Sequence, residues 1–109
     1  MKVTKPKKYR LDLTVNNHQI TTVLIGQHYR IKHGHYMNDK LILDLIMALD
    51  GGKFSVDSIA SGIEYFAADV VHGGDYNNKR IYRLIWLIEG EYLEVIGVIN
   101  AYRRRKKVK

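Results

Sequence analysis

Three of the five histidines in this 109-residue chain lie within one short segment, residues 27–36, QHYRIKHGHY. The segment combines imidazoles with aromatic rings and with the cations Arg30 and Lys32. Histidine transfers protons near neutral pH, aromatic rings stack on bases, and cations hold phosphate. RNA cleavage has these requirements, because the 2′-hydroxyl loses a proton and the departing 5′-oxygen gains one. The segment therefore predicts a proton-transfer site among its histidines, and a polar loop whose rings pack on a helix start is the alternative.

A metal site is a competing use of the same histidines. His33 and His35 could chelate an ion, with His28 and Asp39 completing the ligand set. However, the chain has no cysteine, and the spacing matches no established zinc pattern. We therefore predict neither a metal ion nor another cofactor.

A cation within an apolar segment marks a second candidate site. Arg83 interrupts residues 81–87, IYRLIWL, which otherwise read as a buried strand. A buried cation without a partner is costly, so Arg83 must reach water, an acid or a ligand. A structural ion pair with Glu94 or Asp69 is one alternative. Binding of a phosphate group is the other.

The end of the last predicted strand supplies two further candidates. Tyr102 and Arg103 close that strand, and they could lie beside Arg83 across the sheet. Tyrosine at such a position is more often a capping aromatic residue than a functional one. We retain both residues as candidates for orienting a ligand.

The elements that would position these residues follow from hydrophobic periodicity. Alternation predicts a hairpin of strands at residues 11–15 and 20–25, and residues 63–71, 80–88 and 92–102 read as three further strands. Asn38 is a predicted helix cap, and a helix follows from Asp39 to Asp50, where two glycines stop it. Residues 56–61 could add one helical turn. The apolar face of the helix comprises Leu41, Ile42, Leu45, Ile46 and Leu49, widened by Leu43 and Met47.

The predicted fold is α+β, with an antiparallel sheet in ββαβββ order and one main helix on one face. The strand at residues 80–88 should be central and covered on both faces, because nearly every position is apolar. The length predicts a single domain spanning residues 1–109.

Positive charge is concentrated at the two ends of the chain. Of the 18 Lys and Arg, five lie in residues 1–10 and six in residues 103–109, which leaves seven in the body against all 11 Asp and Glu. Such basic arms are typical of nucleic-acid binders, because Lys and Arg displace counterions from phosphates. Solubilising tails are the alternative. The candidate nucleic-acid contacts are Lys7, Lys8, Arg10, Arg30, Lys32, Arg104, Arg105, Lys106 and Lys107.

Composition also indicates the cellular compartment of the protein. Without cysteine the chain forms no disulfide, which fits a reducing compartment. No apolar run approaches the roughly 18 residues that span a bilayer, and the basic N-terminus leads into no signal-peptide core. We therefore expect a soluble cytoplasmic protein that makes no membrane contact.

The layout of residues 28–103 resembles the RelE/ParE-like group of bacterial toxins, within the barnase–EndoU–colicin–RelE ribonuclease fold. The features that carry the resemblance are a histidine-bearing segment entering a helix, an arginine on the middle strand in IYRLIW (81–86), and a last strand ending GVINAYR (97–103). The resemblance implies that His28 or His33 transfers the proton and that Arg83 stabilises the phosphorane. It also implies that Tyr102 or Arg103 orients the scissile nucleotide.

Three functions follow as hypotheses. The first is a metal-independent toxin-like ribonuclease acting on RNA, which the resemblance implies would be held in check by an antitoxin or immunity protein. The second is a non-catalytic module that binds nucleic acid or a protein. The third is an immunity-type partner whose mildly acidic body covers a basic toxin.

Overall fold

A computed structural model describes residues 5–74 and 79–104 of the chain. Its elements are β1 (Lys7–Val15), β2 (His18–Ile25), α1 (Tyr29–His33), α2 (Asp39–Met47), β3 (Val56–Ala60), β4 (Ile63–Gly74), β5 (Lys79–Glu89) and β6 (Val95–Arg104). The fold is mixed α/β, with one six-stranded sheet and two helices. The predicted ββαβββ order was therefore incomplete, because it lacked α1 and β3.

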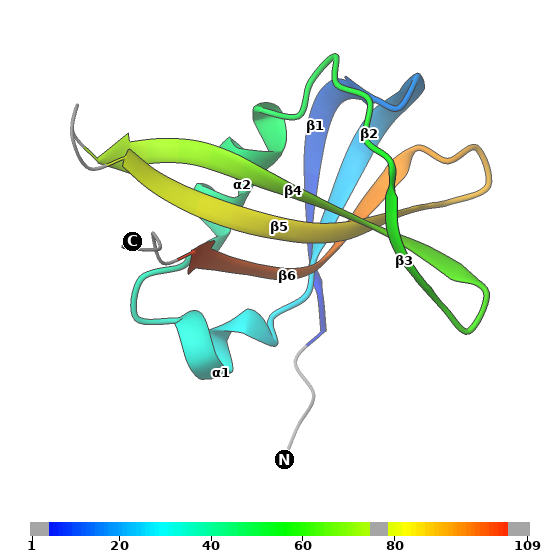
Figure 1. Cartoon of the computed structure of the whole chain (residues 1–109). Helices are drawn as coiled ribbons and strands as arrows, with labels where there is room; N and C mark the ends of the chain where they lie inside the picture. Colours follow the sequence, from blue (N-terminus) through cyan, green and yellow to red (C-terminus); the bar gives the residue numbers. More distant parts are fainter. Residues whose placement is uncertain (1–4, 75–78, 105–109) are drawn as a thin grey trace.

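The strands are ordered β1-β2-β6-β5-β4-β3 across the sheet (Figure 1). Four of the five neighbouring pairs are antiparallel, as predicted. The exception is β2 with β6, which run parallel through Thr22–Ile25 and Val95–Val98. The chain between β2 and β6 contains both helices and strands β3, β4 and β5, and this long crossover is what allows the two strands to run parallel.

Strand β5 lies between β6 and β4, so the predicted internal position is confirmed. The expectation that both of its faces are covered was wrong. Tyr82, Leu84 and Trp86 are buried in the core, whereas Arg83 and Ile85 on the opposite face are only partly buried. Alternation along a strand places these two sets on opposite faces, and α2 packs only on the first.

Helix α2 begins where the sequence predicts. The side chain of Asn38 accepts a hydrogen bond from the backbone N–H of Leu41 at 2.8 Å, which satisfies one of the free donors of the first turn. The helix ends at Met47 rather than Asp50, and Met47 is 42% exposed instead of widening the buried face. The buried positions of the predicted helical face are Ile42, Leu45, Ile46 and Leu49.

Two segments adopt a different structure from the predicted one. Residues 56–61, predicted as a helical turn, contain β3, which forms a hairpin with β4. Ser61 and Gly62 both have positive φ, 52° and 77°, which is the backbone that a tight hairpin turn requires. Tyr29–His33, predicted as part of a polar loop, forms the short helix α1, whose buried residue is Tyr29.

The predicted basic arms are partly built into the sheet. Strand β1 begins at Lys7 instead of Leu11, and Lys7–Arg10 pairs with Thr22–Ile25 of β2. Strand β6 continues to Arg104. Neither helix of the described residues is long and apolar enough to cross a bilayer.

Candidate functional site

His33 lies at the end of α1, beside the C-terminal half of β6. Its imidazole stacks on the ring of Tyr102, with centroids 5.6 Å apart and an interplanar angle of 28°. Strand β2 pairs with β6 only as far as Val98, and no described strand pairs with residues 99–104 on that side. The free edge of β6 therefore leaves room for the α1 segment, and the histidine reaches Tyr102 there.

Tyr36 holds the same imidazole through a hydrogen bond. Its hydroxyl lies 2.9 Å from Nδ1 of His33 and accepts a hydrogen bond from the backbone N–H of Arg103 at 3.0 Å. The guanidinium of Arg103 also lies over the Tyr36 ring, 4.7 Å from its centroid. With the Arg103 amide bonded to its oxygen, the Tyr36 hydroxyl can direct its proton at Nδ1. That arrangement places the ring proton of a neutral His33 on Nε2.

The two aromatic partners of His33, Tyr102 and Tyr36, lie toward opposite faces of the sheet. Tyr102 is paired across the strands with Arg83, so both point away from α2. Arg103 is paired with Tyr82, a core residue, and it therefore faces the side of the sheet that α2 covers, where it contacts Tyr36. His33 thus sits at the sheet edge between two ring systems, one belonging to each face. We call His33, Tyr36, Tyr102 and Arg103 the edge cluster.

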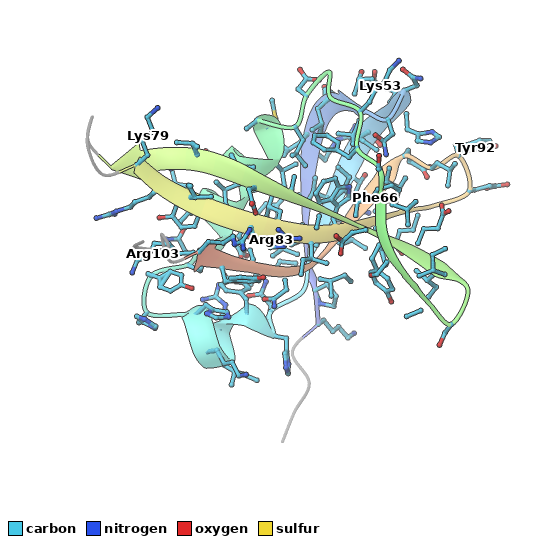
Figure 2. All side chains as sticks on the ribbon, in the orientation of Figure 1. Lys53, Phe66, Lys79, Arg83, Tyr92 and Arg103 are labelled. Carbon is cyan, nitrogen blue, oxygen red and sulfur yellow. The ribbon has the colours of Figure 1, made fainter. Side chains whose placement is uncertain are left out.

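Arg83 lies next to the edge cluster but is held by acids. Its guanidinium lies 3.1 Å from Asp69 and 3.6 Å from Asp57, and its side chain is 26% exposed. Arg104 bonds the second oxygen of Asp69 at 2.8 Å. Of the two acids expected as partners for Arg83, the structure pairs it with Asp69 and not with Glu94. Figure 2 shows Arg83 near the middle of the sheet and Arg103 toward the end of β6.

The structure separates the two histidine candidates. His28 is an exposed residue at the N-cap of α1, whereas His33 ends the helix. Among the described residues, the ring contacts and hydrogen bonds of the edge cluster include His33 and not His28. His35 packs edge-to-face on Tyr36, with ring centroids 4.8 Å apart.

The predicted nucleic-acid contacts fall into several places. Lys7, Lys8 and Arg10 are exposed on the edge strand β1, and Lys32 is exposed on α1. Arg104 ends β6, whereas Arg105, Lys106 and Lys107 lie outside the described residues.

The guanidinium of Arg30 contacts two side chains of the interior. Its Nε donates to the side chain of Gln27 at 2.6 Å, and its guanidinium lies 3.5 Å from the carboxylate of Asp39. The residue remains exposed on α1, so its charge is shared between solvent and these partners.

Asp39 is the centre of a buried polar network that supports the edge cluster. Its carboxylate accepts hydrogen bonds from the hydroxyls of Tyr9 at 2.6 Å and Tyr29 at 2.7 Å, and from the amide of Gln27 at 3.2 Å. These partners come from β1, from α1 and from the segment before α1. The network therefore ties α1 to the start of α2 and positions the segment that carries His33.

In this network, the hydrogen bonds together change the pKa of Asp39 more than burial does. Burial by itself raises the pKa of Asp39, but the hydrogen bonds from Tyr29, Tyr9 and Gln27 and the charge of Arg30 leave that pKa below its ordinary value. Burial and the bond to Asp39 raise the pKa of Tyr29. Both groups therefore hold their ordinary charge states at neutral pH.

Sequence reasoning missed this network and the role of Tyr36. Asp39 was considered only as a possible metal ligand and as a favourable first residue of the helix, and Tyr36 only as one aromatic residue of the histidine-rich segment. Local sequence gives no signal for a bond between residues 9 and 39, because the pairing depends on how β1 packs against α2.

The described residues contain no group of three or more His, Asp or Glu side chains arranged to hold a metal ion. Comparison of the chain with protein-family models, with curated proteins and with solved structures finds no significant match. The function of the site must therefore be argued from its own residues.

Proposed function

We propose that the protein is a metal-independent, toxin-like ribonuclease that cleaves RNA at the edge cluster. The observation that carries this proposal is the fixed imidazole of His33, stacked on Tyr102 and hydrogen-bonded through Nδ1 to Tyr36. An imidazole oriented in this way presents Nε2 toward a ligand while its other nitrogen is occupied. An RNA strand would find a proton donor, stacking surfaces and cations within one small region.

The chemistry assigns each residue a task. The 2′-hydroxyl gives its proton to water as its oxygen attacks phosphorus, and the bond to the 5′-oxygen breaks. His33 acts in its imidazolium form, with Nδ1–H donated to the Tyr36 hydroxyl, and Nε2 delivers its proton to the departing oxygen. Arg83 stabilises charge on the phosphorane, for which it must exchange Asp69 or Asp57 for phosphate oxygens. The rings of Tyr102 and Tyr36 offer surfaces on which bases stack.

Basic residues at the same end of the sheet support RNA as the ligand. Arg103 and Arg104 end β6, and Lys79 and Arg80 begin the neighbouring strand β5. We call these four residues the basic end; Figure 2 labels Lys79 and Arg103 there. Because a polyanion binds by displacing counterions, such grouped charges favour nucleic acid over a neutral ligand.

The decisive test is RNA cleavage in the presence of a chelator, followed by gel electrophoresis. His33→Ala should lower the cleavage rate by about 10²-fold or more, the usual contribution of a positioned proton donor. His28→Ala is the matched control and should cleave normally. His33→Phe keeps a ring on Tyr102 but cannot transfer a proton, so it should bind RNA and fail to cleave it. Normal cleavage by His33→Ala would overturn the assignment.

A second candidate function, protein binding, is favoured by exposed apolar residues at the opposite end of the sheet. Ile59 is 66% exposed, Ile63 44% and Leu93 42%, and they border a hollow of about 450 Å³. We call these three residues the apolar end. Clustered exposed apolar side chains mark surfaces that bind other proteins.

Induced expression in a bacterial host separates the two functions. Growth arrest with fragmented RNA, relieved by His33→Ala, supports the ribonuclease. Arrest with intact RNA, relieved by Ile63→Asp at the apolar end, supports protein binding. Absence of arrest would favour an immunity-type partner, whose target is a toxin and not the host.

A further inference from the structure

A pocket of about 380 Å³ lies between α2 and strands β4 and β5, and Tyr36, which bonds His33, forms part of its lining. Its lining includes Lys40 and Asp44 from α2, His72 from β4, and Arg80 and Tyr82 from β5. The pocket therefore joins two cations, one acid and a histidine to aromatic walls. None of these five residues takes part in the edge cluster.

His72 is held in a defined position within this pocket. Its Nε2 lies 3.7 Å from the carboxylate of Asp44, and its ring packs edge-to-face on Tyr82 with centroids 6.4 Å apart. Lys40 contacts the same oxygen of Asp44 at 3.7 Å, one helical turn away. The carboxylate of Asp44 therefore contacts both Lys40 and His72, and its negative charge is offset within the pocket.

The charge balance of the pocket suits an anion. Lys40 and Arg80 are positive, Asp44 is negative, and the His72 ring can donate a hydrogen bond from a ring N–H. Tyr82 and Tyr36 supply flat apolar surface beside these charges. A phosphate attached to a base and a ribose matches this combination better than a free inorganic anion does, because an inorganic anion has no flat apolar surface to place against the tyrosine rings that line the pocket.

Tyr36 makes the pocket continuous with the edge cluster. The residue lines the pocket, bonds His33 through its hydroxyl and stacks under Arg103. A strand of RNA with its scissile phosphate at His33 can therefore extend over Arg103 and Tyr36 into the space between α2 and the hairpin.

We propose that this pocket is a nucleotide subsite, which binds the nucleotide flanking the scissile phosphate. Lys40 and Arg80 hold its phosphodiester, His72 donates a hydrogen bond to it, and Tyr36 or Tyr82 contacts its base. The inference rests on the proposed ribonuclease for the identity of the ligand. The pocket itself is a binding site that can be tested without cleavage.

The test is a titration with adenosine monophosphate, followed through the imidazole resonances of the histidines by NMR. The His72 signal is assigned from its loss in His72→Gln. Adenosine monophosphate should shift that signal in a saturable manner, and adenosine, which lacks the phosphate, should bind at least tenfold more weakly. The double variant Lys40→Ala/Arg80→Ala should weaken nucleotide binding by tenfold or more. Lys53→Ala is the matched control and should bind as the wild type does.

An unmoved His72 signal, or equal binding by the double variant, would overturn the subsite. If the wild-type protein nevertheless cleaves RNA and His33→Ala does not, the ribonuclease proposal stands without it. Conversely, nucleotide binding beside His72 in a protein that leaves RNA intact would overturn the ribonuclease and leave a nucleotide-binding pocket.

Discussion

The two ends of the sheet differ in charge and in apolar exposure. The basic end carries Lys79, Arg80, Arg103 and Arg104, and it adjoins the edge cluster. The opposite end holds Ile59, Ile63 and Leu93. Glu89 ends β5 there, and the β5–β6 connection adds Glu91 and Glu94. The total charge of +7 conceals this contrast. The first end adjoins the proposed RNA site, and the other carries the apolar residues on which the alternative proposal of protein binding rests.

Replacing Arg83 should cause the largest loss of cleavage rate if Arg83 and the edge cluster form a catalytic site. Arg83→Ala should reduce RNA cleavage by about 10²-fold, because it removes the positive charge opposite the developing phosphorane charge. The fold should survive, since the ion pairs of Arg83 with Asp69 and Asp57 are partly solvated. Single-turnover cleavage with a parallel thermal melt measures both effects. A folded Arg83→Ala protein that cleaves normally would remove Arg83 from the mechanism.

The Asp39 network should matter next, because it positions the segment carrying His33. Asp39→Asn should lower the free energy of unfolding by about 2 kcal/mol at pH 7, since the amide places a donor among the donors of Tyr9, Tyr29 and Gln27. Asp12→Asn, at an exposed position on β1, is the matched control and should change little.

The pH dependence of that difference follows from the lowered pKa of Asp39. A carboxylate whose folded pKa is depressed contributes stability above its unfolded pKa of about 3.9, and loses it as pH falls through the folded pKa. The difference in the free energy of unfolding between wild type and Asp39→Asn should therefore be constant from pH 7 to about pH 4 and become smaller at lower pH. Denaturant unfolding at several pH values measures it. An unchanged difference at pH 2.5 would contradict the charged network.

Equal charge changes at two positions can test the contrast between the ends directly. Arg103→Glu should weaken binding of single-stranded RNA by about tenfold, because it reverses a charge that belongs both to the basic end and to the edge cluster. Lys53→Glu makes the same change away from the basic end and should have little effect; Figure 2 shows the two positions well apart. Fluorescence anisotropy at fixed salt gives both affinities. Equal losses would mean that RNA responds only to net charge.

Removal of the C-terminal tail, residues 105–109, should have the smallest effect on RNA binding. Removing residues 105–109 deletes Arg105, Lys106, Lys107 and Lys109 while leaving β6 intact. Each lost phosphate contact should make the slope of log affinity against log salt shallower by about 0.7. Salt titration of the full-length and shortened proteins gives the slopes. Identical slopes would make the tail a solubilising segment and leave the basic end as the only support for RNA binding.

Local patterns in the sequence predicted much of the fold but little of the site. The cap at Asn38 and the apolar face of α2 were correct, because capping and helical periodicity act over a few residues. The strand β3 was missed, since its exposed residues show no alternation and only Ser61 and Gly62 mark the hairpin. The placement of Tyr102 opposite Arg83 was anticipated, but the aromatic and acidic partners of these residues were only partly foreseen.

The sequence by itself determined the segregation of charge to the chain ends, the start of α2 and the succession of strands from β4 to β6. Only the tertiary structure decided that β2 lies parallel to β6 and stops at Val98. That choice leaves the rest of β6 open, which selects His33 over His28 and brings Tyr36 under Arg103. The physical reason is distance along the chain. Pairing residues 22–25 with residues 95–98 depends on how the whole sheet buries its core around α2, and no local pattern records that outcome.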